Sequence, residues 1–172
     1  MRIAALAFWL LAQEAEGVYT DEERGFSMPI PKGWSVTRSA DRAKALTMRP
    51  PAEAHPQSTC VVAVQDAMKA VTDGQVTLDR FLEEVKKEYP KKFVDFEFVK
   101  AEKGKDGENL TLSLVYKYTS GGQQKIQQFQ HLVWTKTAHV SVVFGCRVDA
   151  FDGQLDFFEK HAKAFKALPK KP

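Results

Sequence analysis

The 172-residue chain has little of several things that mark specialised proteins. It has only two cysteines and no CxxC pair, a pattern that does not build a zinc finger or a disulfide-rich scaffold. Its formal net charge of +3 is small, which weighs against a surface dedicated to nucleic acid. It also lacks a GxSxG motif and a glycine-rich turn leading into a helix, so neither a hydrolase nucleophile elbow nor a phosphate cradle is predicted.

Long apolar runs are missing as well, and the longest one lies at the N-terminus. Arg2 precedes the run IAALAFWLLA, and the polar stretch QEAEG follows it. A run of about ten apolar residues is typical of a secretory signal peptide, whereas a membrane-spanning helix needs about twenty. Small residues at Ala15 and Gly17 complete a cleavage pattern. The sequence predicts a signal peptide over 1–17, with a retained anchor or an ordinary apolar helix as alternatives. A single domain over 18–172 would then be periplasmic or secreted, with no stable transmembrane segment.

The two cysteines each lie in a run of residues that is typical of a β-strand. Cys60 belongs to TCVVAV and Cys146 to VSVVFGC. In an oxidising compartment they are candidates for a disulfide, provided that their strands are neighbours and their side chains face one another. The alternative is a pair of buried free thiols that behave as small apolar side chains.

Two segments repeat apolar residues at steps of three and four, which predicts amphipathic helices. The first begins after Thr77, which is a suitable N-cap, and is expected to end at Pro90. The second is expected to run from a cap at Asp152 to Pro169.

The remaining apolar runs alternate with polar residues, as in half-buried strands. Strands are predicted at 26–30, 34–38, 45–49, 58–66, 93–104, 109–120, 125–135 and 139–148. Asp106-Gly107 is a strong hairpin signal between two of them. The order ββββ-α-ββββ-α predicts an α+β domain, with an antiparallel β-sheet and helices packed on it.

A short motif opens this domain, and it carries a family resemblance. The first predicted strand ends in Pro31-Lys32-Gly33-Trp34, and a small sheet, a helix, a four-strand meander and a C-terminal helix follow. This arrangement resembles the PsbP-like superfamily, and most closely its exported bacterial DcrB-like members. The resemblance implies an α/β/α sandwich without enzymatic activity that serves as an accessory or binding module. It supplies no catalytic residue to place on this chain.

Few residues are candidates for catalysis or metal binding. His131 and His139 flank the TKTA turn and could approach one another across a hairpin, which makes them weak candidates for metal binding. Two imidazoles alone do not complete a metal site, so no metal or cofactor is expected. We predict a binding domain rather than an enzyme. The alternatives are a hydrolase or metal-dependent enzyme with a site near these histidines, and a structural component of the cell envelope.

Trp34 is the residue of the opening motif whose role is least settled. It enters the second strand in phase with Val36, as a core-facing residue would, and a ligand contact is the alternative. The expected partner of the domain is a protein in the cell envelope or an apolar ligand, held on a sheet face or in a groove.

Overall fold

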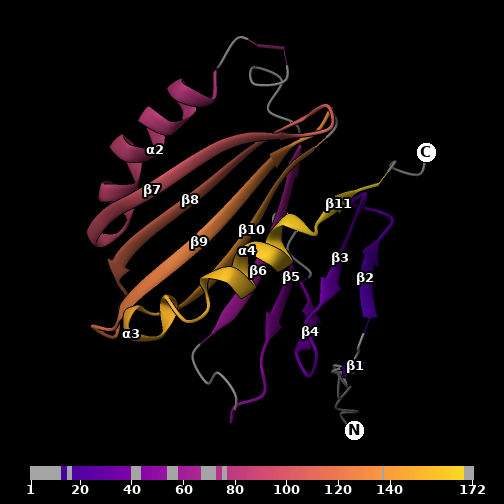
Figure 1. Cartoon of the computed structure of the whole chain (residues 1–172), viewed down its shortest axis with the longest axis horizontal. Helices are drawn as coiled ribbons and strands as arrows, with labels where there is room; N and C mark the ends of the chain where they lie inside the picture. Colours follow the sequence, from indigo (N-terminus) through magenta and orange to yellow (C-terminus); the bar gives the residue numbers. More distant parts are fainter. Residues whose placement is uncertain are drawn as a thin grey trace, which may run out of the picture.

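Most of the chain folds into one large antiparallel sheet and one small one (Figure 1). The computed structural model describes residues 13–14, 17–39, 44–53, 58–66, 73–74, 77–136 and 138–168. Within these residues the eight-stranded sheet has the order β1-β4-β5-β6-β10-β9-β8-β7, and the three-stranded sheet has the order β11-β3-β2.

The strands and helices have the following bounds. The strands of the first half are β1 Gln13–Glu14, β2 Gly17–Asp21, β3 Phe26–Ile30, β4 Ser35–Arg38, β5 Lys44–Arg49 and β6 Thr59–Asp66. The second half contains α2 Leu78–Lys92, β7 Val94–Asp106, β8 Asn109–Thr119, β9 Lys125–Trp134, β10 Ala138–Arg147, α3 Val148–Phe151, α4 Leu155–Lys163 and β11 Lys166–Ala167.

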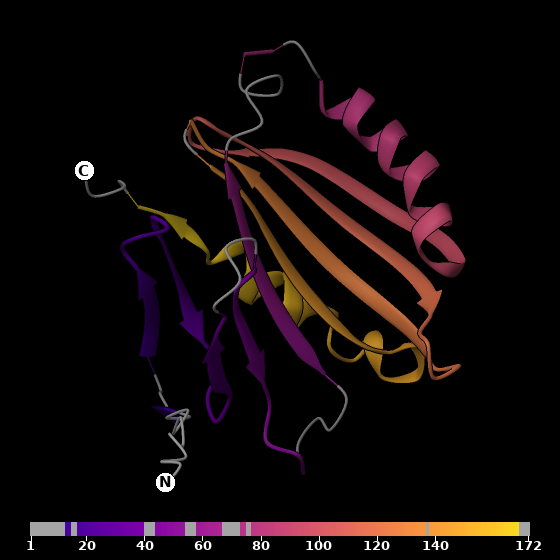
Figure 2. The same ribbon diagram turned by 180° about the vertical axis from the view of Figure 1, so that it is seen from behind.

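The large sheet separates two hydrophobic cores, and helices cover both of its faces (Figures 1 and 2). One core lies between α2 and the alternate residues Leu112, Leu114 and Leu132 of β8 and β9. The other lies under α3 and α4 and includes Val115 and Phe129, which point to the opposite face of the same strands. This is the α+β architecture that the sequence predicts, with helices packed on an antiparallel sheet.

The structure adds strands that the sequence did not predict. β2 and β11 flank β3 in the small sheet. The first predicted strand, which is β3, therefore pairs with these two segments and not with a strand of the large sheet. β1, within the predicted signal peptide, pairs with Ser35 and Val36 of β4. Residues 1–12 and 15–16 of that predicted signal peptide lie outside the described residues, and cleavage stays a prediction.

The predicted end of the first helix at Pro90 is wrong. Thr77 caps α2 as expected, because its hydroxyl accepts a hydrogen bond from the backbone N–H of Arg80 at 3.2 Å. The helix continues past Pro90 to Lys92, and the N–H of Phe93 donates to the carbonyl of Tyr89 at 2.9 Å. Proline lacks an N–H and its ring crowds the carbonyl four residues before it, but the N–H groups that follow it can still pair, so the helix continues for two more residues.

The predicted bounds of the C-terminal helix are also wrong, because α4 covers only Leu155–Lys163 and the short helix α3 lies before the predicted start. Asp152 lies at the C-terminus of α3 and does not cap the start of a helix. A turn follows, and α4 ends at Lys163. The chain beyond it is held as strand β11 by pairing with β3, and Phe165 stacks on Phe26 with ring centroids 5.7 Å apart. Pro169, the expected end, lies outside the described residues.

The opening motif forms a tight turn that directs Trp34 into the larger core. The N–H of Trp34 donates to the carbonyl of Pro31 at 3.0 Å, and Gly33 adopts a φ of +76°, which favours glycine. The indole is only 3% exposed and contacts Phe144 and Phe157, with ring centroids 6.1 and 5.6 Å away. Trp34 is therefore a core residue in the described structure.

Candidate functional site

The two cysteines lie on neighbouring strands but are not bonded. Cys60 of β6 stands opposite Phe144 of β10, so Cys146 lies two residues further along and diagonal to Cys60. Diagonal side chains on one sheet face are about 7–8 Å apart, beyond the reach of a disulfide without movement of the backbone. Both are buried free thiols. Burial raises the pKa of both, that of Cys146 to about 11 with a contribution from Asp149, so neither is an activated nucleophile.

The two candidate metal ligands do not share a site. His139 stands opposite Trp134 in the β9–β10 hairpin, whereas His131 stands opposite Val142. The odd offset places the two imidazoles on opposite faces of the sheet, because successive strand residues alternate faces. The weak candidate of a metal site shared by His131 and His139 is therefore wrong. The part of the chain that the structure describes contains no group of three or more His, Cys, Asp or Glu side chains suited to a metal ion.

His139 lies in an aromatic environment under α2. Its ring stacks on Trp134 with centroids 4.9 Å apart and meets the edge of Phe81. Both ring nitrogens of His139 and the indole nitrogen of Trp134 are buried without a hydrogen-bond partner among the described residues. Burial lowers the pKa of His139 to about 4, so the imidazole is neutral near neutral pH.

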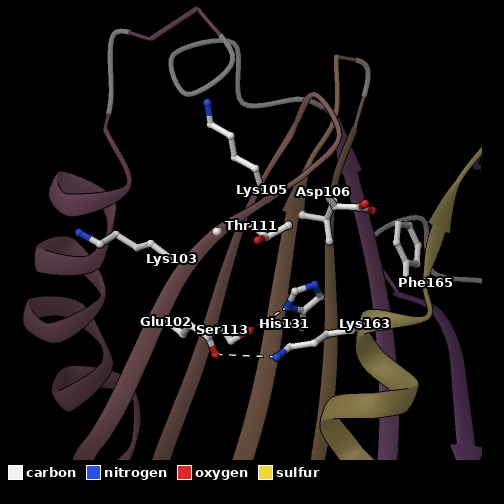
Figure 3. A pocket seen from close by; sticks show the side chains of 11 residues that line it. Glu102, Lys103, Lys105, Asp106, Thr111, Ser113, His131, Lys163 and Phe165 are labelled. Atoms are coloured by element: carbon white, nitrogen blue, oxygen red, sulfur yellow. Dashed lines mark hydrogen bonds and ion pairs between the residues drawn. The ribbon is translucent and has the colours of Figure 1, made fainter.

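His131 faces the opposite side, where it forms part of a cavity of about 290 Å³ (Figure 3). Strands β8 and β9 form the floor, and the walls come from the end of β7 and from the segment that leaves α4. The lining residues are Glu102, Lys103, Gly104, Lys105, Asp106, Thr111, Ser113, His131, Val133, Lys163 and Phe165. We call this space the hairpin cavity, because it lies beside the β7–β8 turn.

The floor of the hairpin cavity carries buried polar groups on an otherwise apolar sheet face. Ser113 stands directly opposite His131, and Ser113 Oγ and His131 Nδ1 share a hydrogen bond of 2.9 Å. Thr111 lies one step along the same face, where Gly104 leaves room for its hydroxyl: a Cβ at Gly104 would come within 2.9 Å of Thr111 Oγ1. Burial lowers the pKa of His131 to about 4, and the charge of Lys163 acts in the same direction.

Ion pairs connect β7 to α4 beside this floor. Lys163 Nζ lies 3.3 Å from Glu159 Oε2 and 3.8 Å from Glu102 Oε2, and Lys100 Nζ lies 3.4 Å from Glu159 Oε1. Figure 3 shows the Glu102–Lys163 pair beside Ser113 and His131. Such partly exposed pairs contribute about 0–1 kcal/mol each to stability, so they can open at little cost.

The arrangement is better suited to binding than to catalysis. A Ser–His pair acts as a nucleophile when the histidine is a competent base and a third group orients it. Here the pKa of His131 is about 4, far below the range that suits a base at neutral pH. In the described structure no acidic side chain is hydrogen-bonded to its Nε2, so the imidazole offers the cavity a hydrogen-bonding group.

Part of this site was visible in the sequence and part was not. Thr111 and Ser113 alternate with the leucines of one strand, and this is a signal that one face of the strand is more polar than the other. Their position next to His131 depends on the register of the β8–β9 hairpin, which the sequence pattern does not specify. The contribution of Lys163 depends on where α4 crosses the sheet, which the sequence pattern does not specify.

Comparisons with known proteins identify the fold. No protein-family model matches the chain, and no curated protein matches its sequence. Among solved structures, it is similar to cyanobacterial PsbP (CyanoP) from Synechocystis sp. PCC 6803, with a TM-score of 0.70 and 15% identity over 91% of this chain and 95% of that one. It is also similar to LpqN, involved in cell envelope biogenesis of Mycobacterium tuberculosis, with a TM-score of 0.61 and 14% identity over 84% and 83%.

A third similar structure is PA94 from Pseudomonas aeruginosa, a protein of unknown function, with a TM-score of 0.53 and 10% identity over 85% of this chain and 92% of that one. The chain therefore has a PsbP-like fold, as the opening motif and element order indicate. The narrower resemblance to DcrB-like proteins stays a prediction. None of the described helices is long and apolar enough to cross a membrane.

Proposed function

We propose that this protein is an exported, non-enzymatic accessory domain that binds a protein partner of the cell envelope through the hairpin cavity and its rim. The observation that carries the proposal is the cavity itself, where buried Thr111, Ser113 and His131 face a space of about 290 Å³. Buried polar groups are stabilised by hydrogen-bonding partners, so a surface that presents them to an open space is suited to a polar ligand group.

The predicted export of the chain is consistent with this proposal. LpqN, a similar structure, is described as involved in cell envelope biogenesis, and the predicted signal peptide would bring this chain to the same kind of environment. The polar lining favours a polar group of a partner over the apolar ligand that the sequence also allowed. A hydrolase remains a second candidate because of the 2.9 Å contact between Ser113 and His131, but the low pKa of His131 favours binding.

Site-specific crosslinking tests the partner. A photoreactive amino acid replaces Asp106, an exposed residue that lines the cavity (Figure 3), or Glu53, which is exposed in the connection between β5 and β6. In cells of the source organism, we expect irradiation to give a crosslinked species of one defined mass from position 106 and none from position 53. The same products from both positions, or no product from position 106, would contradict the proposal.

The compartment has its own test. Mass spectrometry of the native protein is expected to show a chain that begins near Val18. An intact Met1 or Arg2 end would overturn the prediction of export.

A further inference from the structure

We infer that the hairpin cavity receives one arginine side chain of the protein partner, whose guanidinium group is held by Glu102, Thr111 and His131. The inference rests on the proposed function and names the side chain that the partner inserts. It follows from a row of side chains across three strands, from buried hydrogen-bond acceptors that have no partner, and from an excess of acidic charge around the floor.

A row of three side chains on neighbouring strands crosses the floor of the cavity. Glu102 of β7 stands opposite Ser113 of β8, and Ser113 stands opposite His131 of β9. Residues that stand opposite one another in a sheet project from the same face, about 5 Å apart. Glu102 therefore extends over the floor from its edge, whereas Asp106 lies at the β7–β8 turn, four residues further along the strand (Figure 3).

Two buried side chains of the floor offer acceptors that have no partner among the described residues. Thr111 is 9% exposed, and its hydroxyl makes no hydrogen bond with any of them. His131 is 6% exposed, and only its Nδ1 is hydrogen-bonded, to Ser113 Oγ. When Nδ1–H donates to this oxygen, Nε2 carries a lone pair that can accept from an N–H group of a ligand. Together with the Glu102 carboxylate, these acceptors favour a ligand group that has several donors.

The charge around the floor is acidic. Lys103 and Lys105 do not contribute, because their register partners Leu112 and Leu110 belong to the face that α2 covers. The charged groups on the cavity side are then Glu102, Asp106 and Glu159 against Lys100 and Lys163, an excess of one acid. Burial and Lys163 lower the pKa of His131, and each of the three carboxylates acts against them, so all lie within electrostatic range of the imidazole. One guanidinium group would balance the excess.

Glu102 can exchange its present partner for a ligand without leaving that partner unpaired. Glu102 Oε2 lies 3.8 Å from Lys163 Nζ, whereas Glu159 Oε2 lies 3.3 Å from the same nitrogen. A guanidinium group can therefore replace Lys163 at Glu102, while Lys163 keeps its pair with Glu159. Partly exposed lysine pairs contribute little to stability, whereas a carboxylate can accept two parallel hydrogen bonds from one guanidinium group.

Arginine suits this arrangement better than lysine. The acceptors come from three neighbouring strands, and a planar guanidinium group carries five N–H donors, whereas an ammonium group has three donors around one nitrogen. Val133 and Phe165 line the same space and are almost fully buried, so they can contact the methylene groups of the arginine. The volume of about 290 Å³ then holds one long side chain, and the remainder of the partner stays outside on the rim.

Blocked tripeptides test the inference on the purified protein. A glycine–arginine–glycine peptide is titrated and followed by backbone NMR signals, and the matched probes carry lysine, or citrulline, which keeps the shape of arginine without its charge. We expect saturable shifts at Thr111, Ser113 and His131, with binding of the citrulline peptide at least about tenfold weaker, which corresponds to about 1.4 kcal/mol, and of the lysine peptide several-fold weaker. Equal binding of either matched probe, or no saturable shift at the floor, would overturn the inference. Tighter binding of free arginine than of the blocked peptide would indicate an amino-acid site and would overturn it as well.

Matched variants locate the contact. Glu102→Gln is expected to weaken binding of the arginine peptide about tenfold. The control Glu97→Gln changes a carboxylate of the same strand that also pairs with a lysine, Lys117 at 3.3 Å, but lies outside the cavity, and it is expected to leave binding unchanged. If Glu102→Gln binds the peptide as tightly as this control, the inference fails.

The crosslink from position 106 reports any partner of the cavity, and Glu102 is unchanged in that variant. A crosslink without a preference for the arginine peptide therefore overturns this inference alone, whereas the absence of a crosslink contradicts the proposed function.

Discussion

Replacing His139 by phenylalanine should make the protein more stable and less sensitive to acid. The ring of His139 is 8% exposed, and neither of its nitrogens has a hydrogen-bond partner among the described residues. Leaving a polar group buried without a partner costs about 1–3 kcal/mol. Phenylalanine keeps the stacking on Trp134 and the contact with Phe81 without that cost. We therefore expect His139→Phe to raise the free energy of unfolding by about 1–3 kcal/mol near pH 7.5.

The acid sensitivity follows from the lowered pKa of His139. Burial lowers this pKa from 6.5 to about 4 in the folded state, so below pH 6.5 the unfolded chain binds a proton that the folded chain does not. Stability is therefore complete above pH 6.5 and is lost as the pH falls from 6.5 toward 4. Between about pH 7.5 and pH 5 the loss that arises from His139 amounts to about 2 kcal/mol.

The assay is urea unfolding of the wild type and of His139→Phe at both pH values. The lowered pKa of His131 gives the wild type a second loss of similar size, so the wild type should lose about 4 kcal/mol and the variant about 2. His131→Gln, which keeps a polar partner for Ser113, should also lose about 2 kcal/mol. An unchanged loss in His139→Phe, or a variant that is less stable at both pH values, would refute the reasoning.

Other substitutions test the opening turn and the β2–β3 turn. Trp34→Ala should lower the free energy of unfolding by about 3–5 kcal/mol in urea, because it empties a buried site; a stable variant would contradict a core role. Gly33→Ala should cost about 1–2 kcal/mol because of the positive φ, whereas Gly121→Ala, where a Cβ meets no atom within 4 Å, should cost less than half as much in the same assay. Burial would raise the pKa of Asp21, but hydrogen bonds and charge from Arg24 and the charge of Arg38 hold it below its ordinary value. Arg24→Met should raise that pKa in a carboxyl NMR titration, and an unchanged pKa would show that Arg24 has no such role.

The sequence predicts the elements of this fold better than their ends. The start of α2 was predictable because Thr77, a residue type that caps helices, directly precedes Leu78, the first apolar residue of a helical repeat. The end of α2 was not predictable, because Pro90 is compatible both with a helix that ends before it and with one that continues past it to Lys92. The short strand β11, where the sequence predicts helix, depends on contacts distant in the sequence, such as the pairing of Lys166 with Ser27.

The candidate site was less predictable for the same reason. Trp34 could be placed in the core because it lies two residues before Val36, so that both side chains face the same side of one strand. This inference needs no knowledge of the other strands. The histidines needed the register of the β9–β10 hairpin, since a shift of one residue moves a side chain to the other face of the sheet. The pairing of Ser113 with His131 needed the β8–β9 register in addition.

The central claim is that the buried polar floor of the hairpin cavity binds a partner, and one crosslinking comparison tests it most directly. With the photoreactive amino acid at position 106, Thr111→Val replaces a hydroxyl of the floor by a methyl group of nearly the same size. We expect this change to reduce the yield of the crosslinked species several-fold at equal protein level and equal thermal stability. An undiminished yield in Thr111→Val would contradict the account, because the partner would then not contact the cavity floor.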